Sequence, residues 1–225
     1  MDKLNKVKEI LSKYNHEYLL KYCNLIENNN EKEKFLDEIL NIDFYLQEKL
    51  YDSTKKLNNS AFTNVENVTA INKNNFSEEE FDKYFKIGIE EIRSGKLGVV
   101  TLAGGQGTRL GHNGPKGTYE LLPNLSLFEI LCNNFKKAYD KYGVFINWYI
   151  MTSKENYNQT VTFFEEKNYF DYPKEYITFF KQDDIPQNSI DGELLVNESF
   201  KIVRGANGHG RSIWFYEEYW SIRRC

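Results

Sequence analysis

The stretch "VVTLAGGQGTRLGHNGPKG", residues 99–117, decides the fold. Its first residues are apolar and β-branched, which is typical of a buried central strand in a parallel sheet. Six glycines follow, and the only charged side chains among them are Arg109 and Lys116. Glycine lets backbone N–H groups turn toward an anion without a Cβ in the way. Because ligands of open α/β sheets bind where the strands end, this loop is predicted to bind a phosphate-bearing ligand.

The loop differs from two familiar phosphate-binding motifs. No GxxxxGK[ST] pattern can be written across it, and the glycines around Gln106 are spaced GxGxxxG rather than GxGxxG. Pro115 interrupts any helix that would start directly after the glycines. An ATP-binding or dinucleotide-binding loop is therefore disfavoured. A glycine-rich surface loop without a ligand is the remaining alternative. Because the loop directly follows an apolar strand, this alternative is less favoured.

The neighbouring segments predict alternating helices and strands. Ser77 and Glu80 form a capping box at the start of a helix that ends at Gly95. A buried apolar stripe is expected on this helix, formed by Phe81, Tyr84, Phe85, Ile89 and Ile92. After the loop we expect a helix over 126–143, a strand over 144–153, a helix over 154–170, a strand over 175–182 and a hairpin over 188–204 around Asp191 and Gly192. This order predicts an α/β fold with a mostly parallel, Rossmann-like sheet.

The first 75 residues predict a helical N-terminal extension. Val7 and Leu11 belong to one run at helical spacing and Phe35 and Ile39 to another, with a turn expected at 27–33 between the runs. Residues 51–76 lack periodicity and are expected to form a long connection. The predicted domains are therefore the helical extension with its connection, 1–75, and the N-terminal part of a nucleotide-binding α/β domain, 76–210.

Composition narrows the class of partner. The chain has 225 residues and a formal net charge of −4, which argues against a general basic surface for nucleic acid. No apolar run approaches the length that spans a membrane. Cys23, Cys132 and Cys225 lie far apart without CxxC spacing, so neither a disulfide framework nor a metal knuckle is expected. These features predict a cytoplasmic protein with no nucleic-acid or membrane partner.

Longer strings resemble a known enzyme family. "LAGGQGTRLG…GPKG" is similar to the signature of the UDP-sugar pyrophosphorylases, in particular the uridylyltransferases that make UDP-N-acetylglucosamine and UDP-glucose. The resemblance continues through "NWYIMTS", "FFEEKNYF", "ITFFKQDDIP", "IDGELL" and "ANGHG". It implies a nucleotidyltransferase (GT-A-like) sheet. It also implies transfer of UMP from UTP to a sugar 1-phosphate, either N-acetylglucosamine 1-phosphate or glucose 1-phosphate, with release of pyrophosphate.

The resemblance also implies roles for residues at matching positions. Arg109 and Lys116 would act in catalysis by meeting the charge of the triphosphate. The nucleotide would be bound by Leu102, Ala103, Gly104, Gly105, Gly107, Thr108, Gln182 and Gly208, and the sugar by His209. Gln182 would read the uracil edge, and a solvated amide at a strand end is the alternative for this residue. His112 has no counterpart in the family and is expected to be an exposed loop histidine.

The sequence departs from this family at its metal ligand and its tail. The resemblance implies Mg²⁺ on the triphosphate, but the protein ligand is expected in a C-terminal half that this sequence lacks, so no metal ligand is expected in this chain. Residues 211–225 resemble nothing in the family, and we hypothesise that they are translated in a shifted reading frame. The chain would then be truncated, with little turnover of its own. The alternative function is a non-catalytic, nucleotide-binding remnant.

Overall fold

The protein divides into two compact units. The structure, a computed structural model, describes residues 2–56 and 70–208. Of the described residues, 2–56 and 184–205 belong to the first unit, and 70–183 and 206–208 belong to the second. The sequence boundaries assign 184–205 to the α/β part of the chain, whereas in the structure these residues pack with the N-terminal helices.

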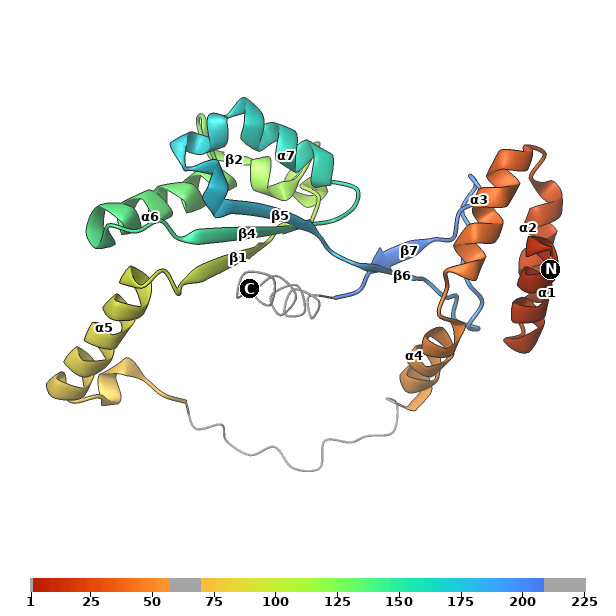
Figure 1. The fold of residues 1–225 in the computed structure, drawn as a ribbon, viewed down its shortest axis with the longest axis horizontal. Helices are drawn as coiled ribbons and strands as arrows, with labels where there is room; N and C mark the ends of the chain where they lie inside the picture. The colour runs from red at the N-terminus through yellow and green to blue at the C-terminus, as the bar shows by residue number, and fades with distance from the viewer. Residues whose placement is uncertain (1, 57–69, 209–225) are drawn as a thin grey trace. The chain divides into compact units, whose positions relative to one another are not determined.

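The first unit is helical. Its helices are α1 (Lys3–Lys13), α2 (Leu20–Leu25), α3 (Asn29–Leu40) and α4 (Phe44–Lys56), with a short 3-10 turn at Glu17–Leu19. Val7, Leu11, Phe35 and Ile39 are buried in its core, as their helical spacing predicts. Figure 1 shows α1, α2 and α3 side by side.

Two predicted boundaries in this unit are wrong. The turn expected at 27–33 contains the start of α3, because the Asn28 side chain accepts hydrogen bonds from the backbone N–H groups of Asn30 and Glu31 and so caps the helix. The connection expected from residue 51 begins later, since α4 continues to Lys56. Residues 57–69 of that connection lie outside the described residues, and a 3-10 turn occupies Lys73–Asn75.

Residues 184–205 return to the helical core. Strands β6 (Asp184–Pro186) and β7 (Arg204–Ala206) form a two-stranded sheet. The predicted hairpin is observed as two successive tight turns, closed by bonds from Ser189 N to Glu193 O and from Asn197 N to Lys201 O. Buried Leu194 joins the same core as Val7 and Leu11.

The second unit contains the predicted parallel sheet. Its strands are β1 (Gly98–Leu102), β4 (Asn147–Thr152) and β5 (Ile177–Lys181), in the order β1-β4-β5. Both pairings are parallel. Among the described residues β4 is the central strand and β1 lies at an edge, half-buried, so the prediction of a buried central strand at the start of 99–117 is wrong there. Within the described part of the chain β1 pairs with β4 alone, which accounts for its partial exposure.

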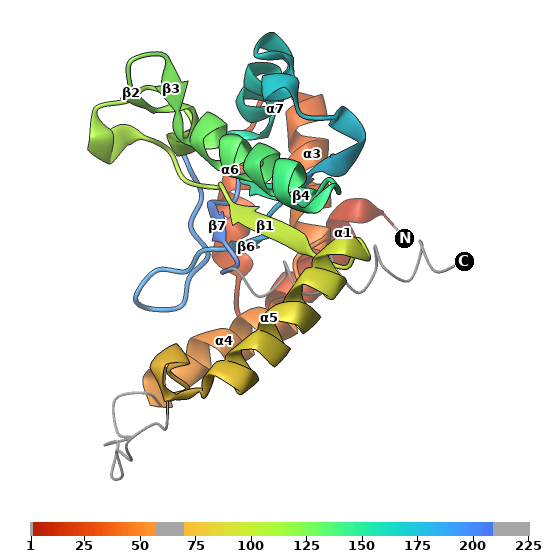
Figure 2. The same cartoon turned by 90° about the vertical axis from the view of Figure 1, so that its left-hand side faces the viewer.

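Two helices cover one face of this sheet. They are α6 (Leu127–Tyr142) and α7 (Tyr157–Glu166), and a small hairpin, β2 (Glu120–Leu122) with β3 (Leu125–Ser126), precedes α6. In both views α6 lies over β4 (Figures 1 and 2). Trp148 of β4 packs edge-on against Phe135 of α6 and Phe164 of α7, at ring-centroid distances of 5.0 and 5.4 Å. This aromatic cluster joins both helices to the central strand.

The predicted helix caps are confirmed. The α5 helix (Glu78–Arg93) begins with the Ser77–Glu80 capping box, and Gly95 follows it with a φ of +69°. Ser126 caps α6 by accepting a hydrogen bond from the backbone N–H of Glu129, and Gly143 ends that helix in the left-handed region. None of the described helices is both long and apolar enough to cross a membrane.

The apolar stripe of α5 is not buried, contrary to prediction. Phe81, Tyr84 and Phe85 are 48%, 55% and 47% exposed, and Ile89 and Ile92 are half-buried. The main packing partner of α5 among the described elements is α6. Periodicity shows which face of a helix is apolar, but not whether another element covers that face.

The Tyr172→Phe variant tests a hydrogen-bonded pair in the α/β core. Tyr172 is 3% exposed, and its hydroxyl donates to the carbonyl of Ile146 and accepts from the amide of the same residue, each at 2.8 Å. Removing the hydroxyl takes this hydrogen-bond partner away from both backbone groups in a buried setting, so we expect a loss of about 1–3 kcal/mol in the free energy of unfolding at pH 7. Urea denaturation measures this loss.

The same variant has an expected pH dependence. Burial raises the pKa of Tyr172 from 10.0 to about 12. The neutral phenol therefore contributes its full stability below pH 10, and that contribution is lost as the pH rises through about 12. The difference in stability between the wild type and Tyr172→Phe should shrink across this window. The control Tyr45→Phe, at a 55% exposed position, should match the wild type at pH 7. A constant difference up to pH 12 would contradict this role.

Candidate functional site

A pocket of about 760 Å³ opens beside the carboxyl ends of β1 and β5. Its volume lies in the range of small-molecule sites. It is lined by the segment from Thr101 to Gly105 and by apolar residues at the start of α6, which are Leu127, Phe128, Ile130 and Leu131. Lys116, Gly117, Gln182, Ala206 and Gly208 complete the lining. The pocket therefore lies where an open α/β sheet binds its ligand.

The glycine loop is folded and hydrogen-bonded. The backbone N–H of Gly107 donates to Gly114 O at 2.8 Å, and that of Lys116 donates to Gly105 O at 3.0 Å. Gly117 approaches the core so closely that a Cβ on it would lie 2.1 Å from the ring of Phe128. A side chain cannot be accommodated there without displacing the aromatic core, which explains a glycine at this position.

His112 is part of the loop's internal structure rather than an exposed histidine. Its Nε2 lies 2.7 Å from Oγ1 of Thr118, whose hydroxyl donates to the carbonyl of Pro115 at 2.8 Å. Because that hydroxyl proton is already used, His112 Nε2 carries the proton and donates. The ring is half-buried and would be 2.8 Å from a Cβ on Gly107. The expectation of an exposed loop histidine is wrong.

Asn156 holds the loop to the sheet, and sequence reasoning missed it. This residue is fully buried, and its Nδ2 donates to the carbonyls of Ala103 at 3.0 Å and Gly105 at 3.4 Å. Its Oδ1 accepts from Ser153 N, and Ser153 Oγ accepts from Asn156 N in return. The S-x-x-N spacing in "TSKENY" is the signal that could have indicated this reciprocal pair.

Gln182 is buried at the end of β5. It is 6% exposed, and its Nε2 donates to Gly208 O at 2.5 Å. Its Oε1 lies 3.0 Å from where a Cβ on Gly104 would be, so Gly104 leaves room for the amide beside the pocket. The alternative of a solvated strand-end amide is wrong. Its proposed contact with a base remains a prediction.

The structure brings most, but not all, of the predicted site residues to the pocket. Those that line it are Leu102, Ala103, Gly104, Gly105, Lys116, Gln182 and Gly208. Gly107, Thr108 and Arg109 follow in the loop but do not line the pocket, and Arg109 is exposed in a 3-10 turn at Thr108–Leu110. His209 lies outside the described residues.

Electrostatics favour an anionic ligand. Lys116 is the single charged side chain among the described residues that line the pocket, and no carboxylate lines it. The other polar groups at hand are backbone amides and the Gln182 side chain. The chemistry of this lining suits phosphate oxygens next to a flat apolar group.

Residues 41–211 match the protein family described as UTP–glucose-1-phosphate uridylyltransferase. The chain belongs to this family. The matched range covers both the glycine loop and Gln182.

Two proteins that are similar to this chain have names that contain UDP-N-acetylglucosamine. UDP-N-acetylglucosamine diphosphorylase 2 of Arabidopsis thaliana is 39% identical over 147 residues, covering 60% of this chain and 29% of the relative. UDP-N-acetylglucosamine pyrophosphorylase of Saccharomyces cerevisiae is 33% identical over 209 residues, covering 90% of this chain and 43% of the relative. The chain thus spans less than half the length of these two relatives.

A solved structure shows the same fold. The uridine diphosphate N-acetylglucosamine pyrophosphorylase of Trypanosoma brucei, crystallised with an inhibitor, superposes with a TM-score of 0.68 at 22% identity. The superposition covers 93% of this chain and 44% of the other. The predicted α/β fold with a mostly parallel nucleotidyltransferase sheet and a helical N-terminal part is confirmed.

The Asn156→Asp variant tests how the loop is held. A carboxylate cannot donate to the carbonyls of Ala103 and Gly105, so we expect a loss of about 1–3 kcal/mol in the free energy of unfolding. We also expect faster hydrogen exchange of the loop amides. The control is Asn158→Asp, at an exposed position in the first turn of α7, where a carboxylate is neutral or slightly favourable. Equal destabilisation of the two variants would contradict the proposed tie.

Proposed function

We propose that this chain binds UTP in the glycine-loop pocket, as the nucleotide-binding part of a uridylyltransferase that transfers UMP from UTP to a sugar 1-phosphate. The observation that supports this most directly is the pocket itself, with Lys116 as its one charged lining residue among those described and a buried amide, Gln182, beside Gly104. The family description and the names of the relatives support the same reaction.

Different residues of the pocket and its loop would bind different parts of the nucleotide. The apolar wall formed by Phe128 and Leu131 suits the flat face of a base. Gln182 would bind the uracil edge, with its Oε1 as acceptor for the base N–H. Lys116 would neutralise phosphate oxygens as a point charge, and Arg109, exposed in the same loop, would add a guanidinium.

The reaction needs charge stabilisation more than covalent help from the protein. An oxygen of the sugar phosphate attacks the α-phosphorus of UTP, the bond from that phosphorus to the bridging oxygen breaks, and pyrophosphate leaves with the electron pair. Positively charged groups close to the phosphates, such as Lys116, lower the barrier to this transfer.

The described residues do not fit a protein-held Mg²⁺. The described pocket lining contains no carboxylate, and the described part of the chain contains no group of three or more His, Cys, Asp or Glu side chains able to hold a metal. Mg²⁺ on the triphosphate is therefore proposed from the family resemblance alone. His209 as a sugar contact and a cytoplasmic location also stay proposals.

A non-catalytic nucleotide-binding protein is the second candidate. The absence of a carboxylate from the described pocket lining favours it for this chain taken alone. Binding of UTP without release of pyrophosphate would support this second function, and measurable pyrophosphate release would support the transferase.

Titration calorimetry with UTP tests the shared part of both candidates. The Lys116→Met variant should weaken UTP binding about tenfold or more, because one charge-assisted contact is worth about 1.5–3 kcal/mol. The matched control Lys137→Met removes an exposed lysine on α6 and should bind as the wild type does. Equal UTP affinities of the two variants would contradict the proposed role of Lys116.

A pair of glycine variants separates ligand contact from fold strain. No atom lies within 4 Å of a Cβ built on Gly105, so Gly105→Ala should keep the melting temperature and lower UTP affinity by projecting into the pocket. Gly104→Ala should also displace Gln182, whose Oε1 would lie at 3.0 Å. Unchanged UTP affinity in both variants would place the nucleotide elsewhere.

The sugar is the least constrained part of the proposal. The names of both relatives contain UDP-N-acetylglucosamine, so we expect N-acetylglucosamine 1-phosphate to be preferred over glucose 1-phosphate. Where pyrophosphate release is measurable, comparing kcat/KM for the two sugar phosphates tests this preference. A higher value for glucose 1-phosphate would reverse the assignment.

A further inference from the structure

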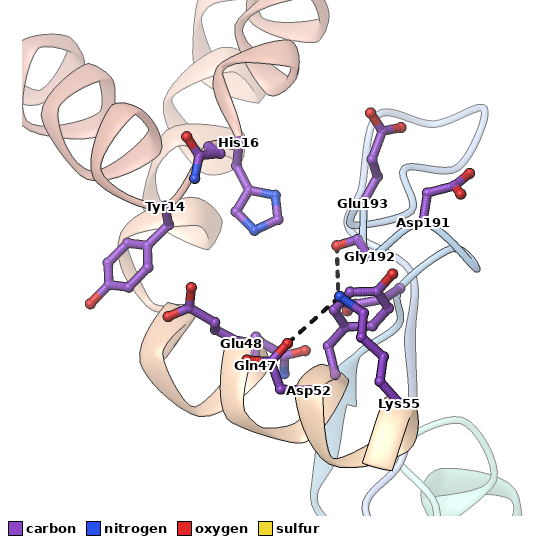
Figure 3. A pocket seen from close by; sticks show the side chains of 12 residues that line it. Tyr14, His16, Gln47, Glu48, Asp52, Lys55, Asp191, Gly192 and Glu193 are labelled. Carbon is purple, nitrogen blue, oxygen red and sulfur yellow. Dashed lines mark hydrogen bonds and ion pairs between the residues drawn. The ribbon is translucent and has the colours of Figure 1, made fainter. Parts of the chain in front are cut away.

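The helical unit contains a second cavity, of about 260 Å³, which the proposed function does not use. It lies between α4, the turn after α1, and the turn at Asp191–Glu193 (Figure 3). Figure 3 shows the His16 ring pointing into the space between α4 and that turn. Gly192 permits this tight arrangement, since its φ is +90° and a Cβ on it would lie 2.6 Å from the Tyr51 ring.

Carboxylates surround the opening of this cavity. Glu48, Asp52, Asp191 and Glu193 line it, and Lys55 is the only lysine or arginine among the described lining residues. Lys55 lies 3.7 Å from Asp52, which leaves the other three carboxylates without an ion pair among the described residues. The local charge is therefore negative, opposite to that of the glycine-loop pocket.

A largely buried glutamine also lines the cavity, and its side chain has no hydrogen-bond partner among the described residues. Gln47 is 5% exposed, lies on α4 beside Glu48, and makes no side-chain hydrogen bond to any described residue. Among the described residues Thr160 Oγ1 is the buried side-chain polar atom without a partner, so the unpaired amide atoms of Gln47 are accessible from the cavity and can bind a ligand or water there. This observation is independent of the carboxylates.

The histidine presents an acceptor as well. Tyr18 donates its hydroxyl proton to Leu194 O at 3.2 Å, so His16 Nδ1, 3.2 Å from the same hydroxyl, must donate to it. Burial lowers the pKa of His16, against the opposing effect of Glu17, Glu193 and Glu48. In the neutral ring Nε2 is then a lone-pair acceptor.

The contacts of Lys55 indicate that this surface can bind an alkylammonium group. Lys55 Nζ lies 4.2 Å from the centroid of the Tyr51 ring while it faces Asp52, so an alkylammonium already rests on an aromatic ring beside a carboxylate. The described residues hold no cluster of His, Cys, Asp and Glu suited to a metal ion, which favours an organic cation over an inorganic one. We propose that this cavity binds a small aliphatic polyamine, with its ammonium groups on the carboxylates of Glu48 and Glu193 and on the Gln47 amide.

Titration calorimetry of the full chain with spermidine, at constant ionic strength, tests the site. We expect saturable binding of one spermidine per chain, weakened about two- to fivefold by Glu48→Gln or Glu193→Gln, as for a partly exposed ion pair. The charge-matched control Glu27→Gln, at an exposed position away from the cavity, should leave the affinity unchanged. Equal weakening by the control, or an equal heat with MgCl₂ in place of spermidine, would overturn the proposal.

The Gln47→Leu variant distinguishes binding from a structural role. Without ligand, replacing an unpaired buried amide by an apolar side chain of similar size should keep or raise the melting temperature. The increase in melting temperature on adding spermidine should fall to less than half. A variant that melts lower without spermidine and keeps the full increase with it would overturn the assignment of Gln47.

Discussion

The side chain of Asn156 determines where the glycine loop lies. One buried amide ties two carbonyls of the loop, Ala103 and Gly105, to the segment between β4 and α7. Glycine-rich backbone has many accessible conformations, and this tie selects one of them. The contact of Gly117 with Phe128 fixes the far end of the loop against the core. The pocket wall and the position of Lys116 both depend on these two anchors.

Sequence patterns located the elements well, because caps and periodicity are local properties. Ser77, Ser126 and Gly143 mark helix ends by short-range hydrogen bonds and backbone geometry, which the sequence contains directly. Asn156 was missed because its partners lie more than fifty positions away in the chain. The exposure of Phe81 was misjudged for a related reason. Which element covers an apolar helix face depends on the tertiary arrangement, and the periodicity of apolar residues along one helix does not predict it.

The net charge of −4 does not describe either pocket, because their lining residues carry opposite local charges. Among the described residues, one lysine and no carboxylate line the pocket of the α/β unit, whereas four carboxylates and one lysine line the cavity of the helical unit. Global charge describes solubility and long-range attraction, but recognition occurs over a few ångströms. Local lining chemistry is therefore the better guide to the ligand of each site.

The helical unit is built from two pieces of chain that are far apart in sequence. Tyr18 bonds the carbonyl of Leu194, 176 positions later, and Ile202 N bonds the carboxylate of Glu38. The entire described α/β sheet is encoded between these pieces. During synthesis from the N-terminus, the first helices must wait for residues 194–202 before their core can close. At ribosomal rates that delay is on the order of 10–40 s. Over that interval Val7 and Leu11 lack the core contacts that residues 194–202 supply. The exposed apolar surface of the emerging N-terminal helices is then available for chaperone binding.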